Sequence, residues 1–213
     1  MTRGRFITFE GGEGAGKSTQ ARLLADALSD LGVPVVRTRE PGGAPGAEML
    51  RELLLSGGVA WSAPAETLLH FAARAEHVVQ TIRPALAAGT WIVCDRFADS
   101  TMAYQGYGQG ADCAMIATLT GLIGLVPDVT IVLDVSDAVA LERLRTRGGT
   151  VDRYERLDAA FHARVNEGFR AIARASQERC ALISADGSET EVHAAVMRAV
   201  WQRVPVDPAM RSA

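Results

Sequence analysis

Apolar residues gather in five short runs, and longer stretches with apolar residues at helical spacing separate them. The runs are rich in Val and Ile and predict strands buried on both faces, at Arg5–Glu10, Pro34–Thr38, Thr90–Cys94, Val129–Val135 and Cys180–Ser184. Because helical stretches separate all five runs, the pattern predicts βαβ crossovers. The expected fold is α/β, a five-stranded parallel sheet flanked by helices on both faces, with ligands at the carboxyl ends of the strands.

Residues typical of helix starts lie where this pattern places helices. Pro64 stands near the expected start of a helix, and Ser188-x-x-Glu191 forms a capping-box pattern. A chain of 213 residues with 48% hydrophobic content is long enough for one large core, so we expect a single domain over residues 1–213.

Charge and cysteine content narrow the class of protein. A net charge of −3 argues against a sequence-independent nucleic-acid binder, which needs a broad cationic surface. Cys94, Cys113 and Cys180 are odd in number and form no C-x-x-C pair, which favours free thiols in a reducing compartment. No apolar stretch approaches the ~18 residues of a membrane span. We expect a soluble cytoplasmic protein that binds neither a nucleic-acid polymer nor a membrane.

A phosphate-binding loop is the most informative feature. Residues 11–18 read GGEGAGKS and fit the pattern G-x-x-x-x-G-K-[ST] between a predicted strand and a predicted helix. The glycines let backbone N–H groups converge on a phosphate at a helix N-terminus, Lys17 adds a cation, and the Ser18 hydroxyl is a potential Mg²⁺ ligand. The fold is therefore expected to be that of a P-loop NTPase.

A carboxylate and a guanidinium side chain follow the third predicted strand. Asp95 and Arg96 would emerge at a strand end that can face the phosphate loop, where an acid orients Mg²⁺ or its waters and an arginine holds phosphate oxygens. The alternative is a surface ion pair at a strand end.

Two helical segments carry candidate binding groups. Phe71 and Arg74 are three residues apart and share a helical face, as a stacking surface and a donor for a flat base would. The alternative for Phe71 is an ordinary core position.

Arg143 and Arg147 share another face, and Arg153 follows two glycines. These arginines suit a small lid at about residues 143–157, although cations at a helix C-terminus are also ordinary dipole partners.

The run DRFADSTMAYQ at residues 95–105 closely resembles the signature D-R-[FY]-x-x-S-x-x-A-[YF]-Q of thymidylate kinases. Four further motifs resemble that family in the same order, namely FEGGEGAGKS at 9–18, TREPGG at 38–43, LR at 50–51 and FAAR at 71–74. The resemblance implies transfer of the γ-phosphoryl group of ATP to dTMP with Mg²⁺, usually in a homodimer.

The resemblance also implies a site. The ATP side would comprise Gly11, Gly12, Glu13, Gly14, Ala15, Gly16, Lys17, Ser18, Thr19 and Arg143, with Ser18 and Asp95 at the metal. The dTMP side would comprise Glu13, Arg51, Phe71, Arg74, Arg96, Ser100, Thr101, Tyr104 and Gln105. Phe71 resembles the residue that stacks on thymine, Arg74 the donor to its ring oxygen, and Thr101 a partner of the ring nitrogen. Tyr104 resembles the aromatic residue under the deoxyribose.

One departure separates two subclasses of the family. Some relatives carry an arginine within the phosphate loop, at the position of Gly14. Here the cations would come from the lid instead, as in the bacterial type, which makes Arg153 and Arg147 catalytic candidates beside Lys17, Arg96 and Glu13. Arg143 would stack on adenine.

Two other functions remain open from the sequence. A kinase for another nucleotide or nucleoside would share most of these motifs, and a slow nucleotide-dependent switch would share the phosphate loop. The sequence contains no N-K-x-D guanine-reading motif, which argues against the switch.

Overall fold

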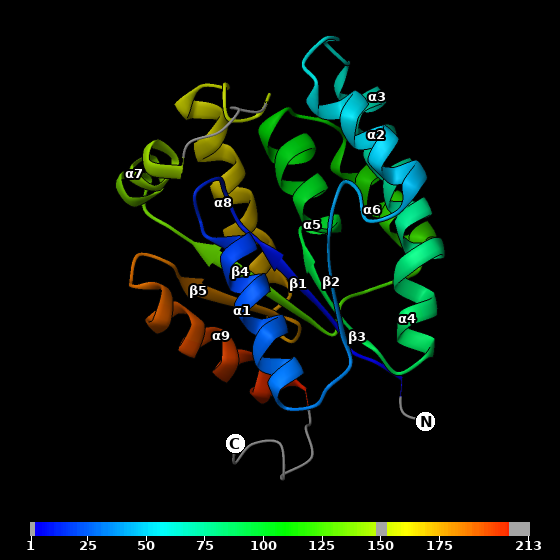
Figure 1. Ribbon diagram of the computed structural model, residues 1–213. Coiled ribbons are helices and arrows are strands. Elements are labelled where there is room, and N and C mark those ends of the chain that lie inside the picture. Colours follow the sequence, from blue (N-terminus) through cyan, green and yellow to red (C-terminus); the bar gives the residue numbers. More distant parts are fainter. Residues whose placement is uncertain (1–2, 148–152, 205–213) are drawn as a thin grey trace.

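The computed structural model describes residues 3–147 and 153–204. Within this part of the chain, five parallel strands form one sheet in the order β2-β3-β1-β4-β5 (Figure 1). The strands are β1 (Phe6–Glu10), β2 (Val35–Arg39), β3 (Trp91–Asp95), β4 (Val129–Asp134) and β5 (Cys180–Ser184). The predicted five-stranded parallel sheet is confirmed, with strand ends shifted by at most one residue.

The two edge strands differ from the prediction of burial on both faces. Every residue of β1 is buried, whereas β2 is partly open and Val36 is 37% exposed. On β5, Leu182 is also exposed. An edge strand has a neighbour on one side only, so an apolar run at the edge reads like a central strand although one face is partly open.

The helices cover both faces of the sheet, as predicted (Figure 1). The helical elements of the described chain are α1 (Lys17–Asp30), α2 (Pro45–Leu55), α3 (Ala63–His77), η1 (Val78–Ile82), α4 (Arg83–Ala87), α5 (Ala98–Thr101), η2 (Met102–Gly108), α6 (Cys113–Ile123), α7 (Asp137–Arg147), α8 (Ala159–Ala175) and α9 (Glu189–Arg203). The π-helical segments η1 and η2 each continue an α-helix without a break.

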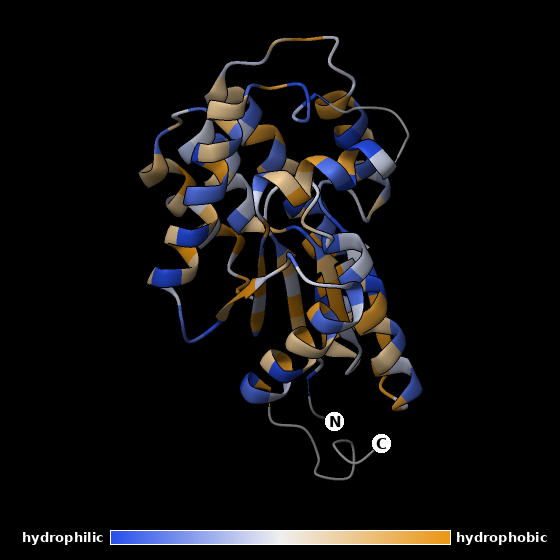
Figure 2. Ribbon diagram, turned by 90° about the vertical axis from the view of Figure 1, so that its left-hand side faces the viewer, coloured by the Kyte–Doolittle hydropathy of each residue, from blue (hydrophilic) through white to orange (hydrophobic). Residues whose placement is uncertain are grey.

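Alternate residues of the central strands build separate cores on the two faces. Ile7 and Phe9 of β1 pack with α1 and α9, while Phe6 packs with η1 and α4. A third cluster joins Val132 of β4 to η2 and α8. The central strands are mostly apolar, and the helices carry both apolar and polar residues (Figure 2).

Helix ends match the punctuation in the sequence. Pro64 lies in the first turn of α3. At α9, the Ser188 Oγ accepts from the Glu191 N–H at 3.3 Å and Glu191 Oε2 accepts from the Ser188 N–H at 2.9 Å, which confirms the capping box.

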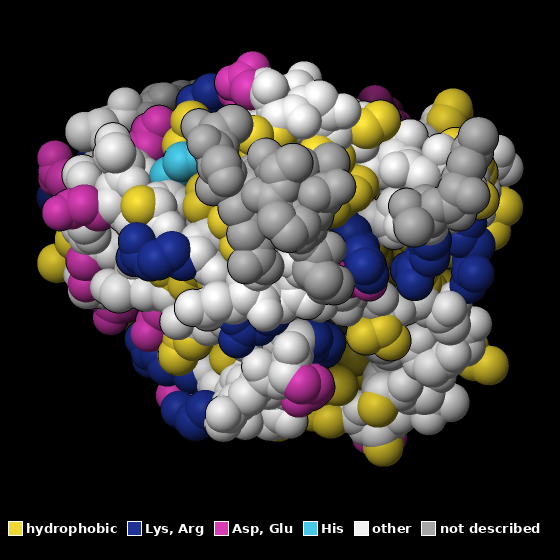
Figure 3. Space-filling model, turned by 90° about the horizontal axis from the view of Figure 1, so that it is seen from below, with side chains coloured by type: hydrophobic (Ala, Val, Ile, Leu, Met, Phe, Trp, Pro, Cys, Tyr) yellow, Lys and Arg dark blue, Asp and Glu magenta, His cyan; other side chains and the backbone are white. Residues whose placement is uncertain are grey.

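Parallel pairing brings the candidate motifs to one edge of the sheet. Phe9 is in register with Asp95 of β3 and with Ile131 of β4, so the loop after β1 and the turn after β3 leave the sheet side by side. On the opposite side, the face seen from below mixes arginine with acidic and apolar side chains rather than presenting one broad basic surface (Figure 3). No helix in the described part of the chain is long and apolar enough to cross a bilayer.

Candidate active site

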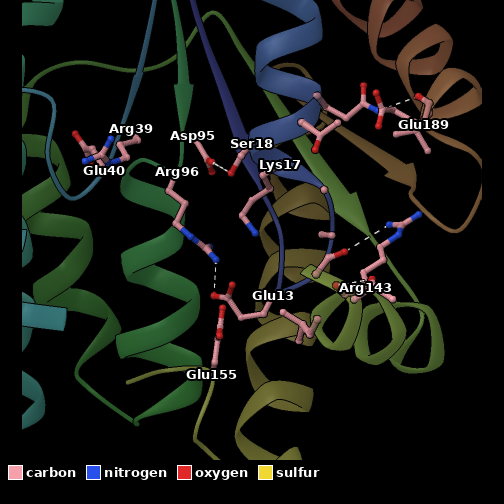
Figure 4. Close-up of a pocket in the computed structure, with 18 of the residues that line it drawn as sticks. Glu13, Lys17, Ser18, Arg39, Glu40, Asp95, Arg96, Arg143, Glu155 and Glu189 are labelled. Atoms are coloured by element: carbon pink, nitrogen blue, oxygen red, sulfur yellow. Dashed lines mark hydrogen bonds and ion pairs between the residues drawn. The ribbon is translucent and has the colours of Figure 1, made fainter. Parts of the chain in front are cut away.

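A cleft of about 1020 Å³ opens at the carboxyl ends of the strands, and we call it the main cleft (Figure 4). Its walls come from the phosphate loop, α7, the turns after β2 and β3, and the start of α9. The lining residues are Glu13, Gly14, Ala15, Gly16, Lys17, Ser18, Thr19, Gln20, Arg39, Glu40, Arg51, Leu55, Ser56, Asp95, Arg96, Arg143, Leu144, Thr146, Glu155, Arg156, Gly187, Ser188, Glu189 and Val192. Most of the predicted ATP-side residues therefore share one cavity.

Backbone geometry explains the glycines of the phosphate loop. Gly11 has φ 134°, and a Cβ there would lie 2.4 Å from the Leu133 carbonyl oxygen. Gly14 has φ 72°, and a Cβ there would lie 2.7 Å from the Ala140 oxygen of α7. Both positions exclude side chains by conformation and by contact. The buried Gly11 and Gly12 support the loop from behind the cleft.

Lys17 begins α1 inside the cleft and is only 7% exposed. Its Nζ donates to the Gly12 carbonyl oxygen at 2.5 Å. Burial, together with the nearby charge of Arg96, lowers the pKa of Lys17 to about 8, although Glu13 and Asp95 act in the opposite direction. A phosphate group beside Nζ would favour the charged form of this lysine.

Ser18 and Asp95 meet as predicted. The Ser18 Oγ donates to Asp95 Oδ2 at 2.5 Å, and both side chains line the main cleft (Figure 4). A hydroxyl and a carboxylate are hard oxygen donors that suit Mg²⁺. Residues 3–147 and 153–204 contain no cluster of three or more His, Cys, Asp or Glu side chains fit for a metal. The Ser18 and Asp95 pair, with only two protein oxygens, fits an ion that keeps most of its waters and binds phosphate oxygens.

Arg96 connects the phosphate loop to the helix after β3. It has φ 70°, the left-handed conformation that non-glycine residues rarely adopt. Its guanidinium donates to the Gly11 carbonyl oxygen at 3.1 Å, to Ser100 Oγ at 3.1 Å and to Glu13 Oε1 at 2.6 Å. The Tyr104 hydroxyl also accepts from Arg96 at 3.0 Å and donates to Glu13 at 2.6 Å. Backbone strain of this kind concentrates at functional sites.

Beneath this cluster lies Glu10, which the sequence did not single out as functional. Glu10 is fully buried and accepts from the Phe97 N–H at 2.8 Å and from Ser100 Oγ at 2.5 Å. Burial, and the nearby carboxylate of Asp99, raise the pKa of Glu10 well above its usual range. Glu10 thus holds the turn that carries Arg96, and no local sequence pattern distinguishes it from an ordinary strand end.

A smaller pocket of about 80 Å³, the side pocket, adjoins the main cleft. The two cavities share Glu13, Glu40, Arg51, Leu55 and Arg96 as walls. The residues that line the side pocket are Glu13, Glu40, Pro41, Arg51, Leu55, His70, Arg74, Arg96, Phe97, Ser100, Thr101, Tyr104, Gln105 and Tyr154. All but one of the predicted dTMP-side residues are among them, so residues far apart in the sequence do converge on one pocket.

Arg74 lines the side pocket and is 2% exposed. Its Nε donates to Glu40 at 2.8 Å, and its Nη2 donates to the Phe97 carbonyl oxygen at 3.0 Å and to Thr101 Oγ1 at 3.1 Å. Its Nη1 is buried and finds no hydrogen-bond partner among the described residues. A buried donor of this kind is costly unless a ligand accepts from it.

Phe71 is the exception among the predicted dTMP-side residues. The Arg74 guanidinium lies 4.8 Å from the centre of the Phe71 ring, so the two share a helical face as expected. Phe71 is 5% exposed and lines neither the main cleft nor the side pocket. Its stacking on a base stays a prediction.

Glu40 has a role that the sequence left undecided. It accepts from Arg74, and its Oε1 lies 3.0 Å from His77 Nδ1. The other ring nitrogen of His77 lies 2.8 Å from Thr38 Oγ1. Glu40 therefore anchors Arg74 and His77 inside the protein, while Arg51 donates to the Pro41 carbonyl oxygen at 2.7 Å.

The predicted lid at 143–157 is described only in part, because residues 148–152 and the side chain of Arg147 lie outside the described residues. Arg143 contacts the Gly14 and Gly187 carbonyl oxygens at 3.5 and 3.2 Å, next to the phosphate loop (Figure 4). Arg153 pairs with buried Glu66 at 2.5 Å and lines neither cavity, whereas Arg156 lines the main cleft.

Two residues of the side pocket were missed by the sequence analysis. His70 Nε2 lies 2.9 Å from the Tyr154 hydroxyl, and both are buried. His70 precedes Phe71 and belongs to no local pattern, and Tyr154 lies 84 residues further along the chain. Only the packing of α3 against residues 153–157 identifies them.

Comparison with known proteins gives the family. The thymidylate kinase family model matches residues 9–196. Thymidylate kinase of Caulobacter vibrioides is 50% identical over 96% of this chain and 99% of its own length, and that of Gluconobacter oxydans is 51% identical over 96% and 97%. The crystal structure of thymidylate kinase from Ehrlichia chaffeensis, 38% identical, matches with a TM-score of 0.78 over 92% of this chain and 98% of that one. This chain belongs to the thymidylate kinase family.

Proposed function

We infer that this chain acts as one kinase domain that transfers the γ-phosphoryl group of ATP to dTMP and releases ADP and dTDP. The observation that carries the assignment is the buried Arg74 Nη1, a donor without a described partner, in a side pocket that adjoins the phosphate loop's cleft. One cavity suits a nucleoside triphosphate and the other a flat ligand with a carbonyl group. A nucleotide switch with one ligand would need no second pocket.

The reaction needs alignment more than proton transfer. A phosphate monoester has a second pKa near 6, so the acceptor is largely a dianion at neutral pH and needs no strong base. Lys17 and Arg96 would bring two polyanions together, and Arg51 would hold the acceptor phosphate. We propose that Ser18 and Asp95 would hold Mg²⁺, which would supply positive charge to neutralise the phosphate groups when bound.

The Arg96, Glu13 and Tyr104 cluster supports the sugar assignment. Tyr104 is 5% exposed and its hydroxyl is fixed between two charged groups, so the ring cannot move to admit a larger sugar without breaking both hydrogen bonds. Glu13 lines both cavities and would meet the sugar and the acceptor phosphate.

Base recognition provides the first test. Arg74 can donate to a thymine carbonyl but cannot accept from a cytosine amine, so we expect kcat/KM for dCMP to be about 100-fold below that for dTMP. The loss of one methyl in dUMP should cost only about 10-fold. A coupled ADP-release assay with dTMP, dUMP, dCMP and no acceptor measures this. ADP release that does not depend on the acceptor would contradict the kinase assignment.

Lys17 provides a test by proton uptake. Its pKa of about 8 means that part of the population is neutral at pH 8, and a bound phosphate should raise that pKa. ADP binding should therefore take up a proton, more at pH 8 than at pH 7, as measured by calorimetry in buffers of different ionisation enthalpy. Lys17→Met is the control and should lack this uptake. Equal heats of ADP binding in all buffers at pH 8 would show that Lys17 takes up no proton when ADP binds.

Arg153 remains our candidate for transition-state charge, together with Arg147. We expect Arg153→Ala to lower kcat about 10-fold or more, with little change in the KM for dTMP. Steady-state kinetics measure both constants, and Arg156→Ala is the matched comparison because Arg156 lines the main cleft. If kcat changes in Arg156→Ala alone, Arg153 has no catalytic role.

We propose a homodimer and a cytoplasmic location, in keeping with the free thiols of Cys94, Cys113 and Cys180. Large apolar side chains are exposed on or next to α3, η1 and α6, namely Leu68, Val79, Leu122 and Val126. Val78 and Ile82 of η1 are buried in this chain's own core and are not available to such a face. The helix presents the neighbouring Val79 instead.

Leu122 is 78% exposed and tests the dimer. Leu122→Arg should shift sedimentation toward the monomer, because a buried charge opposes association. Val36→Arg on the edge strand is the control and should leave the mass unchanged.

A further inference from the structure

Glu66 lies on α3, is 0% exposed and collects hydrogen bonds from four side chains. Its Oε1 accepts from the Tyr154 hydroxyl at 2.6 Å, from Gln109 at 2.8 Å and from Gln105 at 2.9 Å, and its Oε2 accepts from Arg153 at 2.5 Å. The donors come from η2, its C-terminal end and the segment before α8. One carboxylate therefore joins three parts of the chain behind the wall of the side pocket.

The contacts require Glu66 to be ionised. Burial alone would raise the pKa of Glu66, but hydrogen bonds from Tyr154 and Gln109 and the charge of Arg153 outweigh burial, and the pKa lies below its usual value. An ionised carboxylate can only accept hydrogen bonds. Every group that faces Glu66 must therefore present a donor.

This requirement fixes the orientation of Gln105. Its Nε2 donates to Glu66 and also to the Tyr154 oxygen at 3.1 Å, so both amide protons are used. A flipped amide would place its carbonyl oxygen against the carboxylate, which is repulsive. The carbonyl oxygen of Gln105 is consequently the group left to accept a hydrogen bond from a ligand in the side pocket.

The hydrogen bond to Glu66 also determines how the Tyr154 hydroxyl binds Gln105 and His70. Because it donates its one proton to Glu66, it must accept from Gln105 and from His70 Nε2. Burial, together with the charge of Arg74, lowers the pKa of His70 to about 3, so His70 is neutral with its proton on Nε2. The wall of the side pocket thus has one arrangement of donors and acceptors.

We propose that Glu66 is a positioning residue of the side pocket, which holds Gln105 so that its carbonyl oxygen accepts from the ring N–H of a pyrimidine base. Thr101, which the family resemblance offers for the ring nitrogen, already accepts from Arg74 Nη2 at 3.1 Å, and the proposal gives the ring N–H to Gln105 instead. Together with the Arg74 Nη1 donor, this gives the pocket one donor and one acceptor, the complement of a base with adjacent carbonyl and N–H groups. The proposal rests on the proposed function, because it takes dTMP as the ligand.

Glu66→Gln tests the proposal. A neutral amide at position 66 can donate as well as accept, so Gln105 is free to take either orientation. We expect the KM for dTMP to rise about tenfold while the KM for ATP stays within about twofold of wild type. A change in kcat does not count for or against the proposal, because the same substitution weakens the ion pair of Glu66 with Arg153. A residue that only stabilised the fold would lower the melting temperature without this selective change in KM.

A double-mutant cycle with Gln105→Ala identifies the route of the effect. If Glu66 acts through Gln105, the double variant should have the KM of Gln105→Ala alone. Gln109→Met is the matched control, because Gln109 donates to the same carboxylate oxygen but does not line the side pocket. It should leave the KM for dTMP unchanged, and its buried Oε1, which lacks a described partner, is removed at the same time.

Additive effects in the cycle, or an unchanged KM in a folded Glu66→Gln, would overturn the proposal. If Glu66→Gln does not fold, Tyr154→Phe replaces it, since it removes the acceptor of the second Gln105 proton; its rise in KM should vanish in the Gln105→Ala background. Wild-type protein that fails to phosphorylate dTMP would instead refute the proposed function, so the two failures are distinguishable.

Discussion

The contact between the Arg96 guanidinium and the phosphate loop is the interaction on which the site depends. Arg96 itself has a left-handed backbone conformation. This conformation directs its side chain from the end of β3 back toward the Gly11 carbonyl oxygen and Glu13. The same guanidinium binds Ser100 and the Tyr104 hydroxyl, and Arg96 belongs to the wall that the two cavities share. Beneath it, buried Glu10 secures the turn through backbone N–H groups. The conformational cost of this turn is offset by contacts that only one arrangement provides.

Away from Arg96, the interior of the protein contains further ion pairs between arginine and glutamate. Arg74 with Glu40 and Arg153 with Glu66 are buried or half-buried pairs, and each carboxylate accepts additional hydrogen bonds. Buried charges are costly unless both partners and their remaining polar atoms are satisfied. Such pairs add little net stability, but loss of one partner is severe, so they restrict the side chains to one geometry. A rigid polar wall of this kind suits recognition of a small, flat ligand.

Local patterns in the sequence predicted the sheet and the phosphate loop, and parallel strand order predicted that Asp95 and Arg96 face that loop. The convergence of residues 95–105 with Arg51 and Arg74 was implied only by the resemblance to the family. They could not distinguish the edge strand β2 from a central strand, because an apolar run does not reveal its neighbours. They also missed Glu66, His70 and Tyr154. Glu66 and Tyr154 are 88 residues apart, so their hydrogen bond depends on the packing of α3 against the segment before α8. Glu40 stood in a recognised motif, yet its partners were equally invisible.

Gly14 illustrates how backbone shape restricts the sequence changes open to an enzyme. At this position some relatives place an arginine, but here α7 lies so close that even a methyl group would meet the Ala140 carbonyl oxygen. Arg143 from that same helix instead contacts the Gly14 oxygen. Exchange of one arrangement for the other therefore requires a shift of α7 as well as a new side chain. In this chain the loop and α7 are therefore coupled, and a side chain at position 14 alone would collide with that helix.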